Sequence, residues 1–199
     1  PITAGVVFLA AAGLAYNLGL LERHGEAVVA ADLAEVSSDW MVEDGEISIS
    51  ISQFGSDVTG SFAEWTSDIT FDPTPADIMG SVETVVSIGS LTLGSVTAEA
   101  MGPDFFDAET HPTAVFAAEI KPDANAYVAD GPLTIHGNSV PVQLPFVLDL
   151  VGNTAQLAGS LNVNRMDFEV GTSQADESSL AFAVEIMVNL TATKSEAPE

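Results

Sequence analysis

Hydrophobic and polar residues alternate over much of the chain, most clearly in residues 47–52. There Ile47, Ile49 and Ile51 alternate with serines, and a second long alternation covers residues 180–191. A period of two is typical of a strand with one buried face and one exposed face. The pattern predicts eight strands, at residues 46–53, 60–71, 81–91, 113–120, 126–136, 140–150, 155–165 and 179–192.

Gly, Pro, Asn or Asp separates nearly all of these strands, as expected of turns between antiparallel neighbours. Only residues 94–112 break the pattern, and a helical turn fits there. Even-numbered antiparallel strands at this spacing indicate an all-β barrel or a sandwich. A barrel of about eight strands can enclose one small ligand.

The start of the chain has a different character, because residues 2–21 contain no charged side chain. Twenty helical residues span about 30 Å, the thickness of the hydrocarbon core of a membrane. We therefore expect residues 1–21 to form a transmembrane or anchor helix, with a helix of a soluble domain as the alternative. An acidic linker at 22–39, a barrel at 40–194 and a tail at 195–199 follow. Pro1 leaves open that the chain is a segment of a longer polypeptide.

The charge balance is extreme, with 29 acidic residues against 4 basic ones and a net charge of −25. Such a polyanion repels nucleic acid, so no nucleic-acid partner is expected. The acidic surface either steers a cationic partner or is an adaptation to salt, and the second interpretation is favoured. The chain has no cysteine, which excludes disulfides, zinc–thiolate sites and iron–sulfur clusters.

Sequence motifs for catalysis are missing, and an enzyme is therefore not expected. The chain has no G-x-S-x-G motif, no phosphate-binding loop and no G-x-G-x-x-G. Its three histidines are His24 in the linker, His111 before a proline and His136 before a glycine. None has the spacing of a metal motif, so they are interpreted as turn or surface residues, and no metal site is predicted.

Two groups of charged residues remain as candidates. Asp104, Asp107 and Glu109 lack the order of a calcium-binding loop, which favours a solvated loop. Arg165 ends a predicted strand, and Asp167 is the nearest carboxylate in sequence. The pair either contacts a ligand head group or fixes the end of the strand.

Short motifs in a fixed order provide a further indication. They are Trp40, Gln53-Phe54-Gly55, Gly60-Ser61-Phe62, Trp65, Phe71-Asp72-Pro73, Gly102 to Asp107, His111-Pro112, Leu144-Pro145-Phe146 and Arg165 with Asp167-Phe168. In this order and spacing, residues 40–194 resemble the YceI family of polyisoprenoid-binding, lipocalin-like proteins. The resemblance implies an extended eight-stranded antiparallel barrel that holds a polyprenyl chain or a quinone tail without a covalent cofactor.

Binding of such a tail needs little polar recognition, because each buried CH₂ contributes about 0.8 kcal/mol. The resemblance and the alternation together predict a lipid-binding interior. Its predicted residues are Ile51, Phe54, Phe62, Ile69, Val86, Phe106, Phe116, Leu133, Ile135, Leu144, Phe146, Phe182, Ile186 and Val188. Gln53, Arg165 and Asp167 are predicted as head-group or structural residues.

The chain departs from the family pattern in three places. Gln53 stands where many members have histidine, Ala100 or Met101 stands where many have a second histidine, and Glu169 replaces a glycine after R-x-D-F. These changes resemble a subgroup that lies next to, or is fused to, membrane cytochromes b. The expected function is carriage or sensing of an isoprenoid lipid by a membrane-anchored bacterial periplasmic protein. A quinone-presenting partner of a cytochrome b and an interaction module with a filled interior are the alternatives, and a homodimer is left open.

Overall fold

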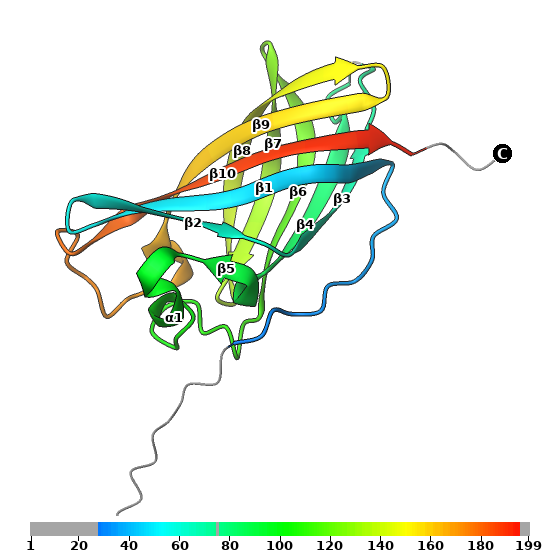
Figure 1. Ribbon diagram of the computed structural model, residues 1–199. Helices are drawn as coiled ribbons and strands as arrows, with labels where there is room; N and C mark the ends of the chain where they lie inside the picture. Colours follow the sequence, from blue (N-terminus) through cyan, green and yellow to red (C-terminus); the bar gives the residue numbers. More distant parts are fainter. Residues whose placement is uncertain (1–27, 75, 196–199) are drawn as a thin grey trace, which may run out of the picture.

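The computed structural model describes residues 28–74 and 76–195, which form an all-β structure with few helical turns. A single antiparallel sheet of ten strands curls into a half-barrel (Figure 1). The hydrophobic helix predicted at residues 1–21 lies outside the described residues. None of the helical segments among the described residues has the length and hydropathy of a membrane-spanning helix.

The strands follow one another in the sheet in the order β3-β4-β6-β7-β8-β9-β10-β1-β2-β5. Their bounds are β1 Trp40–Gln53, β2 Ser56–Phe62, β3 Trp65–Phe71, β4 Gly80–Ser87, β5 Leu91–Thr92, β6 Thr113–Asp123, β7 Ala126–Ile135, β8 Asn138–Val151, β9 Thr154–Asn164 and β10 Leu180–Lys194. The helical segments are η1 Ile88–Ser90, η2 Gly94–Val96, α1 Thr97–Ala100 and η3 Arg165–Phe168.

The sheet has ten strands, so the prediction of eight was wrong. The strand predicted at 60–71 is divided at Ala63 and Glu64, because β2 pairs with β1 whereas β3 pairs with β4. At this corner the amides of both residues donate to Ser90, which fixes the change of direction. The second additional strand is β5, a two-residue strand that pairs with Ser61 and Phe62.

The curled sheet returns on itself where β3 approaches the first half of β1. β2 pairs with β1 only from Ile47 onward, which leaves the beginning of β1 without a strand on that side. Side chains bridge this seam: the Trp40 indole donates to the Phe71 carbonyl at 3.1 Å, and the Ser38 hydroxyl accepts from the Ile69 amide at 2.6 Å. Side chains thus join the β3 edge of the sheet to the start of β1.

One end of the half-barrel is covered by residues 88–112 and 165–171, which we call the cap (Figure 1). The two segments meet where the Gly171 amide donates to the Asp104 carbonyl at 2.9 Å. Phe168, only 1% exposed, packs there with Leu133 and Val170. The linker residues 28–38 have no regular secondary structure, and the Ala31 amide donates to the Ser87 hydroxyl of the wall.

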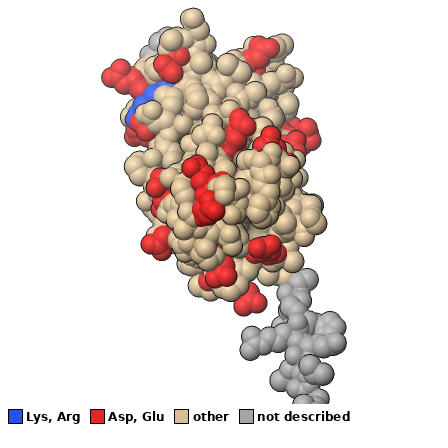
Figure 2. Space-filling model, turned by 90° about the vertical axis from the view of Figure 1, so that its left-hand side faces the viewer, with Lys and Arg blue, Asp and Glu red and all other residues tan. Residues whose placement is uncertain are grey.

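The outer surface is acidic, as the composition predicts. Figure 2 shows Asp and Glu side chains spread over one face of the molecule, with few basic atoms among them. On the outer face of β6 and β7, Lys121 Nζ lies 2.9 Å from Asp130 and 3.2 Å from Glu119. Hydrogen bonding to Lys121 lowers the pKa of Asp130, and the same contacts raise the pKa of Lys121.

Candidate functional site

The inner face of the curled sheet encloses a cavity of about 240 Å³. Every strand except β5 contributes to its wall, and the cap contributes at one end. The lining follows the period of a strand: β1 contributes residues 47, 49, 51 and 53, and β10 contributes residues 184, 186, 188 and 190. The alternation seen in the sequence therefore gives an almost entirely apolar lining.

Most residues predicted to bind lipid have side chains at this cavity. They are Ile51, Phe62, Ile69, Val86, Phe106, Phe116, Leu133, Ile135, Leu144, Phe146, Ile186 and Val188. They come from β1, β2, β3, β4, β6, β7, β8 and β10 and from the loop before β6. A wall of this kind can solvate a long hydrocarbon chain without specific polar contacts.

Phe54 was predicted in the interior, and the structure places it outside. It is 77% exposed at the turn between β1 and β2, where its φ of 49° and the φ of 75° at Gly55 form a tight hairpin connection. The period-two count fails there because the strand ends at Gln53. The turn directs the aromatic ring to solvent.

Phe182 was also predicted in the interior and does not line the cavity. The pairing of β1 with β10 is irregular between Ile51 and Gln53, since Ile51 opposes Val184 whereas Gln53 opposes Leu180. Such an irregularity redirects the side chains beside it. The Phe182 ring instead lies under the Arg165 guanidinium, at 5.3 Å from its centroid.

Arg165 is 3% exposed, and its guanidinium binds several backbone carbonyls at the cap end of the cavity. Its Nη1 donates to the carbonyls of Val170 at 2.9 Å and Gly171 at 2.6 Å, and its Nε donates to Ala181 at 3.0 Å. Nη2 donates to Gln174 and Leu180. Burial lowers the pKa of the guanidinium.

The expected pair of Arg165 with Asp167 does not form, and that part of the prediction was wrong. Asp167 is exposed, and within residues 28–74 and 76–195 the hydrogen bonds of Arg165 go to backbone carbonyls and to the Met166 sulfur. The carbonyls of residues 170–181 fold back around the guanidinium, so proximity in sequence was a poor guide to its partners.

Gln53 lies at the same end of the cavity as Arg165. It lines the cavity and stands opposite Leu180, whose carbonyl accepts from Arg165. Glu99 of the cap also lines the cavity, so a carboxyl group, an amide and a guanidinium lie at this end. The other polar lining residues, Ser67 on β3 and Thr84 on β4, lie within the wall and hydrogen-bond to each other.

Comparison with known proteins agrees with this architecture. The model of the YceI-like domain matches residues 40–192, which is most of the chain. The chain belongs to the YceI-like family. The BcnA crystal structure from Burkholderia cenocepacia is similar to this YceI-like chain, with 32% identity and a TM-score of 0.71, over 75% of this chain and 96% of BcnA.

A more distant structure shares the fold. The YceI protein of Campylobacter jejuni is 18% identical and has a TM-score of 0.61, over 89% of this chain and 97% of its own. A mutant of that protein with a monobromobimane guest is also 18% identical, with a TM-score of 0.62 over the same shares of both chains. The search of curated proteins found no significant match.

Sequence reasoning missed one cluster beside the cavity of this YceI-like domain. Asp107, His111 and His136 have side-chain atoms that all lie within 4.8 Å of one another. The sequence alone predicts two separate turn or surface histidines. The register of β6 and β7, which pairs Val115 with Thr134, places the start of β6 beside the end of β7 and could have predicted their approach.

Proposed function

We propose that this YceI-like protein is a non-enzymatic binding protein that carries or senses an isoprenoid lipid, with the tail in the cavity. The observation that carries the proposal is the continuous apolar lining, which runs from β1 through the sheet to β10. Membership of the YceI-like family supports it, because the fold of this family is a lipid-binding and polyisoprenoid-binding barrel.

The polar end of the cavity defines how the lipid would be oriented. Gln53 offers an amide there, and Arg165 has its donors committed to backbone carbonyls. We propose that Gln53 contacts the head group and that Arg165 shapes the end of the cavity. Affinity would then come mainly from the tail, at about 0.8 kcal/mol for each buried CH₂.

The alternatives differ in what the cavity holds. A quinone would make the protein an accessory of electron transfer, and a membrane cytochrome b is the partner that the sequence suggested. The apolar cavity weighs against an interaction module with a filled interior. A periplasmic location and a membrane tether through residues 1–21 are further parts of the proposal.

Mass spectrometry of organic extracts from the purified full chain tests the proposal directly. We expect an isoprenoid lipid to co-purify with the wild-type protein, and a quinone would favour the electron-transfer variant. A folded protein that neither retains nor takes up a polyprenyl or quinone lipid would refute carriage.

Matched substitutions on neighbouring residues of β8 locate the ligand. Phe146 is 5% exposed and faces the cavity, whereas Val147 is 60% exposed on the outer face. We expect Phe146→Asp to abolish lipid retention, because a carboxylate in an apolar site is strongly disfavoured. Val147→Asp should retain the lipid at the wild-type level.

Ile186→Asp on β10 provides a second variant in case Phe146→Asp does not fold, because Ile186 is only partly buried. Circular dichroism establishes that each variant keeps its β-structure. Lipid retention by a folded Ile186→Asp variant would contradict the assignment of this cavity as the binding site.

A further inference from the structure

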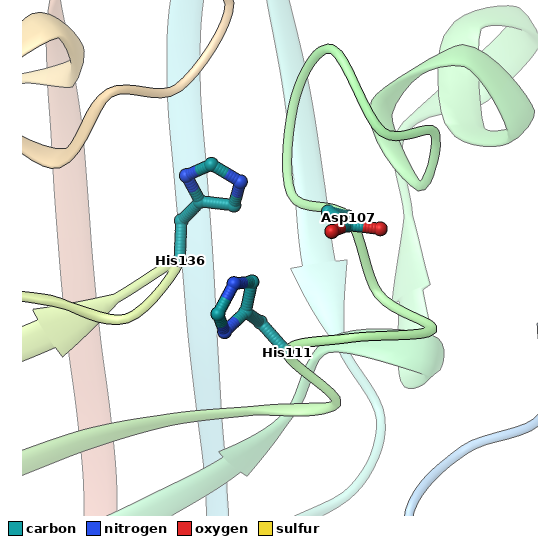
Figure 3. Close-up of side chains that lie close together, drawn as sticks. All are labelled: Asp107, His111 and His136. Carbon is teal, nitrogen blue, oxygen red and sulfur yellow. The ribbon is translucent and has the colours of Figure 1, made fainter.

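Two imidazoles and one carboxylate converge between the cap and the turn that connects β7 to β8. Asp107 and His111 come from the loop before β6, and His136 follows Ile135 at the end of β7 (Figure 3). The ligand atoms of the three side chains all lie within 4.8 Å of one another, and each residue is partly buried. The two imidazole rings are 4.9 Å apart at an angle of 69°.

The loop before β6 holds Asp107 and His111 in a fixed relation. Asp107 has a φ of 44°, and its backbone carbonyl accepts from the amides of Thr110 and His111 at 2.9 and 2.8 Å. Its own amide donates to the Gly102 carbonyl at 2.9 Å. These bonds hold the backbone of Asp107, and its carboxylate lies beside the two histidines (Figure 3).

A backbone carbonyl of the cap orients the His136 ring. Its Nδ1 lies 3.3 Å from the Phe168 carbonyl, which also accepts from Asn138 at 3.0 Å. A ring that donates from Nδ1 presents an unprotonated Nε2 as a ligand, which is the usual arrangement around metal-binding histidines. The contact thus selects the tautomer that a metal requires.

Gly137 makes room for the second ring. A Cβ atom at this position would lie 2.9 Å from Cε1 of His111, and the φ of Gly137 is 76°. The turn of His136 and Gly137 therefore lets His111 pack closely against the backbone. A side chain at residue 137 would push the His111 ring out of this position.

We propose that Asp107, His111 and His136 form a binding site for a divalent transition metal of the zinc type. Two imidazole nitrogens and one carboxylate are three of the four ligands of a tetrahedral zinc site, and water completes it. Imidazole ligands favour zinc, nickel and copper over magnesium and calcium. Ligand atoms around such an ion are about 3.4 Å apart for bonds of about 2.05 Å, so small side-chain rotations suffice.

A metal here would tie two separate parts of the chain together. The loop residue Phe106 and the strand residue Ile135, each adjacent to a ligand, line the cavity, as does Phe168, which orients His136. The ion would thus fix the cap against the wall at the end of the cavity. This role is independent of which lipid, if any, the cavity holds.

Isothermal titration calorimetry with zinc chloride tests the site, on chelator-treated full chain without a polyhistidine tag. We expect one zinc ion for each chain in 0.5 M NaCl, where weak binding to the acidic surface is screened. Magnesium chloride under the same conditions should give no saturable binding. Stoichiometric zinc binding should also raise the melting temperature, because the ion binds the folded state.

The third histidine supplies a matched control for the ligands. His111→Ala and His136→Ala should each weaken zinc binding at least about tenfold, since loss of supporting residues alone costs 10–100-fold. His24→Ala should leave it unchanged. His111→Gln serves as a second variant if an alanine variant does not fold.

Three results would overturn the proposal. They are no saturable zinc binding by the wild-type chain, undiminished binding by the folded His111→Ala/His136→Ala double variant, and an equal loss in His24→Ala. Cobalt substitution gives an independent readout, because tetrahedral cobalt absorbs strongly in the visible range. We expect this absorption in the wild type and its loss in the double variant.

Discussion

The wall of the cavity and its cap are held together in different ways. The wall is a sheet in which alternate side chains point inward, so apolar contacts and regular ladder hydrogen bonds dominate. The cap is irregular, and a single buried side chain, Arg165, satisfies backbone carbonyls from several segments. A wall of this kind tolerates a ligand inside it, whereas the cap depends on a few specific polar contacts.

The largest expected difference in stability is between a substitution inside the wall and one at the tip of a hairpin. Phe62 is 9% exposed at the cavity and Phe54 is 77% exposed at the β1–β2 turn. We expect Phe62→Ala to lower the free energy of unfolding by about 3 kcal/mol, at the low end for a large core aromatic because it borders a cavity. Phe54→Ala should change it by less than about 0.5 kcal/mol. Urea unfolding followed by fluorescence measures both.

The lipid content of the Phe54→Ala variant tests whether this exposed residue takes part in lipid binding. If Phe54→Ala keeps its stability but loses its lipid, then the hairpin tip contacts the lipid. Lipid binding would in that case not be confined to the inner face of the wall. Equal lipid content in this variant and the wild type would support the wall as the binding surface.

A second substitution addresses the cap. Arg165→Met should lower the free energy of unfolding by about 2–3 kcal/mol, because buried carbonyls lose their donor at about 1–3 kcal/mol for each group left unsatisfied, and water can replace part of the loss. Lys121→Met removes a cation from exposed ion pairs on the outer wall. It should leave the urea midpoint nearly unchanged.

One result would contradict the expected difference between Arg165 and Lys121. An Arg165→Met variant that unfolds at the wild-type urea concentration would mean that the cap does not rely on the guanidinium. Hydrogen exchange would sharpen a positive result, since amides of residues 165–171 should lose more protection than amides of β8.

The smallest expected effect is that of salt on the acidic outer surface of the wall and the cap. With a net charge of −25, repulsion between surface carboxylates opposes folding and is screened within about 3 Å at 1 M salt. We expect the melting temperature to rise between low salt and 1 M NaCl. A constant melting temperature in differential scanning calorimetry would contradict this expectation.

Sequence reasoning succeeded where the chain is regular. The period of two predicted an all-β fold and most cavity-lining positions, because the pleat alone decides which face a side chain occupies. It failed at Phe54 and Phe182, where a turn and a register irregularity interrupt the period. It also missed the division of one strand at Ala63, which depends on which neighbour each half pairs with.

Local sequence was least informative in the cap. Asp167 was the nearest candidate partner of Arg165, yet the carbonyls that bind it come from residues 170–181. In the same way, His111 and His136 are far apart in sequence and meet only because β6 and β7 are antiparallel neighbours. Such contacts follow from topology, which no short motif encodes.

The seam between β1 and β3 has a consequence for behaviour at high concentration. An open edge of a sheet offers unpaired amides and carbonyls to strands of other molecules, which promotes edge-to-edge aggregation. Here the Ile69 amide and the Phe71 carbonyl on β3 are already occupied by Ser38 and Trp40. These two groups are therefore not available for pairing with a strand of another molecule. This protection matters for a chain with a mean hydropathy as high as +0.31, because apolar chains associate readily.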